Sequence, residues 1–403
     1  MTWSLLQDWL DFGLRWLHVV AAIFWVGLAL GFLRLNLNLK SSRADVWRAA
    51  DDGFFHISRD MNAPADSQPQ IGWFRWEAYV VWLSGFGLMS LQYFLHADLY
   101  LVDLRLLPMS PPQAVGVALA GLAVGWLVYD FLCKAPFGWN ETTRRAAIFV
   151  FLVAVAYACS RLFSGRGAFL EFGAILGTIM AANVAHVLVP NQRKMLAAVR
   201  AGAPPDEKRF AASRQRALHN NYLAPSVVFL MLSNHYPLAF AGRYNWIVAS
   251  LALIAGASAR HFFIARHRGQ GDLWWTWGVA AMAAAAMVAA STLGSGCDCP
   301  LIAPRDATEA LAAAVAPRFA KVEAIVAARC AVCHAREPAW SGLAAPPKGV
   351  RLDTPAFIRA HALDIARQAV WTRAMPPPGV DTGMNDTDRA RLAAWLKAGA
   401  TLD

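Results

Sequence analysis

The chain has 403 residues, of which 57% are hydrophobic and only 16% are charged. This composition excludes an ordinary soluble domain and a disordered chain, and it is typical of a polytopic membrane protein. The formal net charge of +10 does not require a nucleic-acid partner, because the basic residues gather in loops between apolar runs.

Eight apolar runs are each close to the ~20 residues that cross a bilayer as a helix. They cover 12–33, 76–96, 112–133, 146–163, 168–190, 222–240, 245–265 and 273–293. No basic segment precedes the first run, which favours a retained helix over a cleaved signal peptide. We therefore predict an all-α domain of eight transmembrane helices over residues 1–293, surrounded by the lipid bilayer.

Basic residues mark one side of this predicted bundle. Most of the loop Lys and Arg lie at 34–75, 134–145, 191–216 and 266–268, whereas the intervening loops hold Arg105, Arg166 and Arg243. Under the positive-inside rule the first set of loops faces the cytoplasm. We expect a multi-pass protein of the bacterial inner membrane with both termini in the periplasm.

Ionisable and amide side chains inside apolar runs are costly in lipid, so they are candidate functional residues. Polar residues gather on the cytoplasmic side of the bundle, which favours a pocket for a small, planar, anionic substrate. The candidate catalytic residues open the sixth run, and they are His219, Asn220, Asn221 and Tyr222. Cross-linking of neighbouring helices is the competing interpretation of these side chains.

Four further histidines form two predicted pairs on different helices. His18 and His235 lie toward the periplasm at similar predicted depth, and His186 and His261 lie toward the cytoplasm. Each pair is a candidate for binding a haem b or the substrate, since imidazoles from two helices can hold one iron. The alternative, that they only join helices, predicts no cofactor within the bundle.

The composition changes after residue 293. Residues 294–316 are rich in Gly, Ala and Pro and predict a linker, and residues 317–403 predict a small all-α periplasmic domain. Apolar residues at helical spacing from Phe319 to Val326 predict a helix that leads into the stretch RCAVCHARE.

Cys330, Cys333 and His334 form the pattern C-x-x-C-H. Two thiols one helical turn apart can bond both vinyl groups of a haem while the following His binds iron, so the pattern predicts one covalent haem c. A thioredoxin-like motif would follow a strand, whereas a helix is expected here. A zinc site would require a second Cys/His pair, and only His361 follows.

The second axial ligand of this haem has three candidates. We favour Met375, because the prolines after it form a rigid loop that can hold a weak ligand in place. Met384 is the alternative, and His361 lies in a predicted helix and is expected at the surface. Met/His ligation raises the reduction potential and suits an electron acceptor.

Several longer stretches resemble one known family. They are WFRWEAYVVWLSGF at 73–86, GWLVYDFLCK at 125–134, FSGRGAF at 163–169 and LHNNYLAPSVVFLMLSNHYPLAF at 218–240. They are similar to the bacterial membrane-bound urate oxidase (urate hydroxylase) family, in which an eight-helix domain is fused to a C-terminal cytochrome c. The likeness covers nearly the whole chain.

The resemblance implies that urate is oxidised to 5-hydroxyisourate. Electrons would pass to haem c and on to a soluble cytochrome or terminal oxidase of the respiratory chain, without release of peroxide. It also implies that residues His219 to Tyr222 contact urate, and it adds further motif residues, namely Trp76, Glu77, Asp130, Asn234 and His235.

One departure leaves the substrate open. Family members have His-Gly-Gly-Gly-Phe-Tyr where this chain has Ala-Asp-Asp-Gly-Phe-Phe at 50–55.

The alternative function is a membrane-anchored carrier that moves electrons from quinol or haem b to haem c without urate chemistry. A transporter with an appended cytochrome is a third candidate function.

Overall fold

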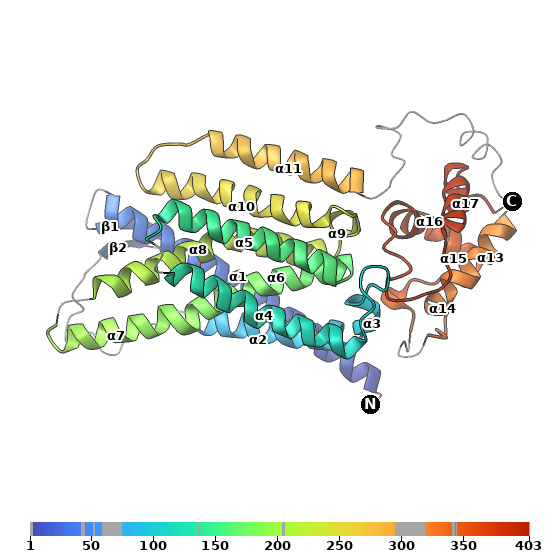
Figure 1. Cartoon of the computed structure of the whole chain (residues 1–403), viewed down its shortest axis with the longest axis horizontal. Coiled ribbons are helices and arrows are strands. Elements are labelled where there is room, and N and C mark those ends of the chain that lie inside the picture. The colour runs from blue at the N-terminus through green and yellow to red at the C-terminus, as the bar shows by residue number, and fades with distance from the viewer. Residues whose placement is uncertain are drawn as a thin grey trace.

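The computed structural model describes residues 3–41, 45–50, 53–58, 75–135, 138–203, 206–294, 319–340, 343 and 345–402. Long helices form a bundle up to residue 294, and shorter helices form a second unit from residue 319 (Figure 1). The predicted linker lies outside the described residues from 295 onward. The predicted all-α class is confirmed.

Eight helical segments run along the bundle among the described residues. They are α1 (Trp3–Ser41), α2 (Trp76–Met89) with the π-helix η1 (Ser90–Phe94), α4 (Pro111–Lys134), α5 (Glu141–Leu162), α6 (Gly165–Ala182) with η2 (Asn183–Leu188) and α7 (Val189–Arg200), α8 (Glu207–Ser233), α10 (Asn245–His267) and α11 (Trp275–Gly294). Two short helices, α3 (Ala97–Tyr100) and α9 (Pro237–Phe240), cap the end nearest the second unit.

Six of these segments, not the predicted eight, are long and apolar enough to cross a membrane, as judged over the described part of the chain. The two exceptions have separate causes. The helix α2 ends after 14 residues at the π-helix η1. The first half of α8 carries Lys208, Arg209, Arg214 and Arg216, so its apolar part is confined to the second half.

The structure adds one small sheet that the prediction lacked. Strands β1 (Asp45–Ala50) and β2 (Gly53–Ser58) form an antiparallel hairpin in which Ala50 lies opposite Gly53. The hairpin includes part of the segment that departs from the family pattern, although residues 51–52 lie outside the described chain. It lies at the end of the bundle away from the second unit (Figure 1).

The core of the bundle is centred on α6. Its residues Phe169, Phe172, Leu176 and Ile179 are fully buried, and α6 packs against α4, α5 and α8. By contrast, α1 exposes large apolar side chains such as Trp16 and Phe24. Apolar side chains facing outward are stable in lipid, so this surface fits a membrane-embedded bundle.

The second unit contains α13 (Phe319–Arg329), α14 (Ala331–His334), the 3-10 helix η3 (Pro347–Gly349), α15 (Pro355–Ala360), α16 (Ala362–Ile365), the π-helix η4 (Ala366–Trp371) and α17 (Asp386–Lys397). It has its own apolar core, in which Val322, Ile358 and Trp395 are buried. A small helical unit with a separate core matches the predicted cytochrome-type domain.

The second unit contacts the end of the bundle near α3, which is also the end where α1 begins (Figure 1). Ala374 packs against the apolar core of the bundle. A side chain at Gly379 would overlap the carbonyl oxygen of Asp98 on α3. The loop from residue 372 to 380 is therefore fitted closely onto the bundle.

Candidate functional site

The C-x-x-C-H motif lies where α13 meets α14, and its three side chains line one cavity. The Nδ1–H of His334 donates to the carbonyl oxygen of Val350 at 2.9 Å. This hydrogen bond fixes the imidazole ring and leaves Nε2 with a lone pair for a metal. Cys330, Cys333 and His334 therefore fit a covalently attached haem whose iron is bound by His334.

Burial determines the charge of this motif. It raises the pKa of the Cys330 thiol to about 12 and also raises the pKa of the Cys333 thiol. Burial lowers the pKa of His334, and the bond to Val350 opposes that change only in part. Redox-active thiols need the opposite, a lowered pKa. The environment is thus unlike that of a reactive dithiol.

The predicted axial ligands fall in different places. Met375 lines the same cavity as His334, and so does His361. Met384 instead packs against the apolar core of the domain. The imidazole of His361 bonds to Asp364 on the same helical segment at 3.0 Å, which holds it near the surface. Met375 is therefore better placed for iron than Met384.

The backbone around Met375 is held at both sides. Its N–H donates to the carbonyl oxygen of Gln368 at 2.9 Å, and its carbonyl oxygen accepts from the guanidinium of Arg389 at 2.9 Å. The peptide bond to Pro376 is cis. These contacts give the Met375 loop a fixed path across the cavity.

The cavity beside His334 continues deep into the bundle, and we call it the long cavity. Its volume is about 1420 Å³, and it extends between α1, α2, α6 and α8 as far as Met180 and Ala181. Apolar side chains form most of its wall inside the bundle, and its polar groups there include Asp11, Arg15, His18, Gln92, His96, Asn234 and His235. The long cavity connects the predicted haem site with the interior of the membrane domain.

The predicted catalytic residues divide between two faces of α8. His219 and Asn220 face α4 and α6, where Nδ1 of His219 lies 2.8 Å from the hydroxyl of Tyr129. The amide of Asn183 donates both to that hydroxyl, at 3.1 Å, and to Oδ1 of Asn220, at 2.8 Å. We call these four residues the inner cluster.

Arg216 lies one turn before His219 and adds a charge to the inner cluster. Its guanidinium donates to the carboxylate of Asp130 at 2.7 Å, and it stacks 5.0 Å from the ring centre of Tyr129. Only 2% of the Arg216 side chain is exposed. The charge of Arg216 is therefore buried and compensated within the protein.

The other two predicted residues face α10. Arg260 donates to Oδ1 of Asn221 at 3.1 Å, and the hydroxyl of Tyr222 lies 2.7 Å from Nδ1 of His261. The structure thus does not bring all four residues to one point. Consecutive residues on a helix point about 100° apart, which is the reason for this division.

The two predicted histidine pairs have different surroundings in the structure. His18 bonds to the carbonyl oxygen of Val81 at 2.9 Å, whereas Asn234, next to His235, accepts from Tyr93 at 3.0 Å. The side chains of His18 and His235 both line the long cavity, so a ligand shared by this pair stays a prediction.

The inner histidines also have different neighbours. His186 lies 6.0 Å from the ring of Trp126 on α4. His261 lies 6.3 Å from the ring of Trp275 on α11, in addition to its bond with Tyr222. Binding of a haem by either pair stays a prediction.

The sequence pattern does not single out Tyr129, and it marks Arg216 only as a loop charge. A signal for both was present. Arg216, His219 and Asn220 are three and four residues apart and so share one face of a helix. Tyr129 directly precedes Asp130, the carboxylate that pairs with Arg216.

Comparison with known families divides the chain at the same place as the structure. The family described as "Urate oxidase N-terminal" matches residues 4–291. The family described as "Cytochrome C oxidase, cbb3-type, subunit III" matches residues 317–396. No curated protein and no solved structure matches the chain.

Proposed function

Because the chain belongs to the urate oxidase N-terminal family, we propose that it oxidises urate to 5-hydroxyisourate and passes the electrons to a haem c in its C-terminal domain. The observation that supports this most directly is the docking of the two units. The cavity that contains Cys330, Cys333 and His334 opens into the membrane domain.

The overall reaction balances with haem as the electron acceptor. Urate and one water give 5-hydroxyisourate, two protons and two electrons. A bound haem c would supply one-electron chemistry, so the two electrons of urate would leave one at a time to a downstream respiratory cytochrome or oxidase. Oxygen is not consumed in this scheme, and no peroxide forms.

The residues of this chain have defined roles in the proposal. Cys330 and Cys333 would hold the haem covalently, and His334 would bind its iron through Nε2. The thioether of Met375 would be the second ligand to the iron, because it lines the same cavity on a loop held by Arg389. The cationic loops between the helices are consistent with a bacterial inner membrane in which the cytochrome domain is periplasmic.

The experiment uses the purified, oxidised full-length protein without oxygen. Addition of urate is expected to produce the absorption band of ferrous haem c and to release 5-hydroxyisourate. Ascorbate serves as the control that the haem can be reduced. Haem that ascorbate reduces and urate does not would contradict the proposal.

A second candidate function is quinol oxidation, and the long cavity favours it. The wall of that cavity is mostly apolar, and Nε2 of His18 is free to contact a quinone oxygen because Nδ1 is used by Val81. Reduction of haem c by a quinol, and not by urate, would support this candidate.

A further inference from the structure

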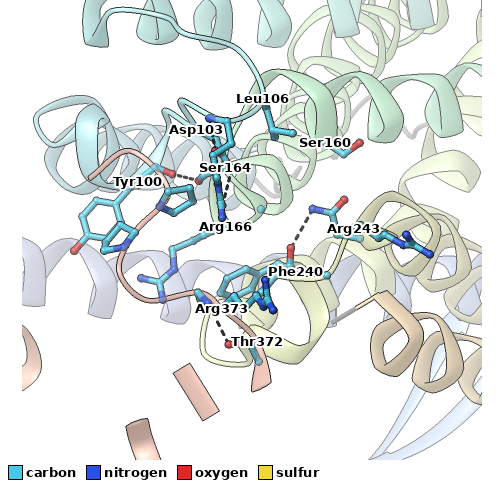
Figure 2. Close-up of a pocket in the computed structure, with 18 of the residues that line it drawn as sticks. Tyr100, Asp103, Leu106, Ser160, Ser164, Arg166, Phe240, Arg243, Thr372 and Arg373 are labelled. Carbon is cyan, nitrogen blue, oxygen red and sulfur yellow. Dashed lines mark hydrogen bonds and ion pairs between the residues drawn. The ribbon is translucent and has the colours of Figure 1, made fainter. Parts of the chain in front are cut away.

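A second cavity of about 330 Å³ lies between the bundle and the loop of the cytochrome domain from Thr372 to Pro378 (Figure 2). We call it the arginine cavity. Five arginines and one carboxylate line it, namely Arg105, Arg161, Arg166, Arg243, Arg373 and Asp103. Figure 2 shows Arg166 of the bundle and Arg373 of the cytochrome domain at this cavity.

The positive charge of the arginine cavity exceeds its negative charge. Arg105 pairs with Asp103 at 3.1 Å, and Arg373 pairs with Asp386 at 2.9 Å. Within the described part of the chain, no carboxylate pairs with Arg161, Arg166 or Arg243. Arg161 and Arg243 are exposed, so solvent screens their charges, whereas Arg166 is half-buried; an anion in the cavity would be attracted by all three guanidinium groups.

The position of Arg166 is fixed by the motif FSGRGAF. Ser164 caps α6 by accepting from the N–H of Gly167 at 3.1 Å, and its hydroxyl donates to the carbonyl oxygen of Tyr100. A side chain at Gly165 would overlap the carbonyl oxygen of Phe240. Gly165 and Gly167, on either side of Arg166, thus let α6 begin against α9 and α3.

Aromatic rings hold the guanidinium of Arg166 from two sides. Its central carbon lies 5.7 Å from the ring centre of Tyr100 and 5.4 Å from that of Phe240. Such contacts orient a guanidinium while leaving its N–H groups free for a ligand. The N-terminus of α6 opens onto the same cavity and adds positive partial charge.

The electrostatic field of Arg166 extends across the domain junction. Lys348 of the cytochrome domain has a lowered pKa, caused mainly by burial and further by Arg166 and Arg15 of the bundle. Burial is the larger cause of this lowered pKa, and the guanidinium groups add a smaller repulsion across the junction.

The size and walls of the arginine cavity select the kind of anion. A volume of 330 Å³ is at the small end of the ~300–1,000 Å³ range of ligand pockets, which suits one bicyclic molecule. Tyr157 and Trp246, whose ring centres are 5.4 Å apart, form an aromatic wall. Arginine forks and aromatic rings together favour a planar, hydrogen-bonding anion over a simple inorganic one.

The arginine cavity adjoins the predicted haem site. Arg166, Met375 and Pro377 line both this cavity and the long cavity. A donor bound between the arginines therefore lies beside the loop that carries the proposed iron ligand. A donor at the inner cluster would be separated from the haem by much of the ~30 Å thickness of the bilayer.

We infer that the arginine cavity is where the urate anion binds for oxidation, with Arg166 and Arg243 contacting its oxygens and the cytochrome loop completing the wall. This inference rests on the proposed function. It explains the fusion of the two domains, because Thr372, Arg373 and Ala374 supply part of the site.

Binding is measured separately from electron transfer. Equilibrium dialysis of labelled urate against the reduced, oxygen-free full-length protein gives an affinity without turnover, since ferrous haem accepts no electron. We expect Arg166→Gln to weaken binding by about tenfold to a hundredfold, the usual effect of losing a charged hydrogen bond. Arg243→Gln should weaken it by about tenfold, and Arg166→Lys by less than Arg166→Gln.

The matched control lies at the opposite end of α5. Arg145 is exposed and pairs with Glu141, so Arg145→Gln removes the same charge far from the cavity and should leave urate affinity unchanged. Haem content, measured as the pyridine haemochrome, reports whether each variant folds. Reduction of each variant by ascorbate checks that its haem remains functional.

Two results would overturn the inference. If Arg166→Gln and Arg243→Gln bind urate like the wild type while His219→Ala does not, the site is the inner cluster and the proposed function stands. If the wild type neither binds urate nor is reduced by it, the proposed function fails together with the inference.

Discussion

The inner cluster and the arginine cavity both gather polar side chains from several helices, yet they differ in how those side chains are paired. In the inner cluster the charge of Arg216 is compensated by Asp130, and Tyr129, Asn183 and Asn220 bond to one another. In the arginine cavity Asp103 pairs with Arg105, whereas Arg166 lines the cavity with no carboxylate partner among the described residues. Paired polar groups hold helices together, whereas unpaired ones around a cavity are available to a ligand.

The inner cluster still leaves three buried polar atoms without a partner, namely Nε2 of His219, Oδ1 of Asn183 and Nη1 of Arg216. They comprise both donors and acceptors, which is the requirement of a bound water molecule. Neither the long cavity nor the arginine cavity is lined by His219 or Asn220. The inner cluster therefore fits a structural role with internal water.

The largest expected effect concerns the connection of the arginine cavity to the haem. Met375→Ala should abolish the absorption band of Met–iron ligation in the oxidised protein, because Met375 lines the cavity and Met384 lies in the core. Optical spectroscopy provides the measurement. Met384→Ala is the matched control and should keep the band; loss of the band in that variant alone would reverse the assignment.

Next in size is the removal of the buried charge pair in the inner cluster. Asp130→Asn leaves the guanidinium of Arg216 buried and uncompensated, which we expect to cost about 3–5 kcal/mol of unfolding free energy. Thermal unfolding in detergent provides the comparison. Lys134 pairs with the same carboxylate but is exposed, so Lys134→Gln should cost about 0–1 kcal/mol. If Asp130→Asn and Lys134→Gln lose the same unfolding free energy, the buried ion pair with Arg216 adds no more stability than the exposed pair with Lys134.

A smaller effect separates stability from binding at His219. His219→Ala removes the contact with Tyr129, and we expect a loss of about 1–3 kcal/mol in unfolding free energy. Urate affinity of the reduced protein should stay within about threefold of the wild type, because the binding site lies elsewhere. Dialysis and thermal unfolding of the same preparation test this, and a large loss of affinity would restore the sequence-based hypothesis.

The smallest effect is expected at the helix cap that positions Arg166. Ser164→Ala removes the cap of α6 and should cost about 1 kcal/mol, with urate affinity lowered a few fold. Asn140 caps α5 at the opposite end by accepting from Thr143. Asn140→Ala is therefore the control that should lose similar stability and no affinity. If the two variants bind urate with the same affinity, the Ser164 cap does not contribute to urate binding at the arginine cavity.

The sequence predicted the helices and the haem motif because both depend on local patterns. Apolar runs and the C-x-x-C-H spacing need only neighbouring residues. The sequence favours Met375 over Met384 as the iron ligand for a local reason as well, because prolines follow Met375 directly. The early end of α2 at η1 was not predictable, since a π-helix leaves no change in apolar composition.

The arrangement of polar residues could not be predicted for a different reason. His219 and Asn221 are near in sequence but face different helices, and only the packing of α8 between α6 and α10 shows it. The arginine cavity lies between α6, α9 and the loop from Thr372 to Pro378, which is far from them in the sequence. The sequence alone therefore shows Arg166 only as an isolated charge in a loop. Contacts between domains leave no periodic signal in a single chain.

The most direct test compares urate-driven reduction of haem c in Arg166→Gln, His219→Ala and Arg145→Gln by stopped-flow absorbance. We expect kcat/KM for urate to fall by about tenfold to a hundredfold in Arg166→Gln and to stay near the wild-type value in the other two variants. A wild-type rate in Arg166→Gln together with a lost rate in His219→Ala would contradict the location of urate binding at the domain junction.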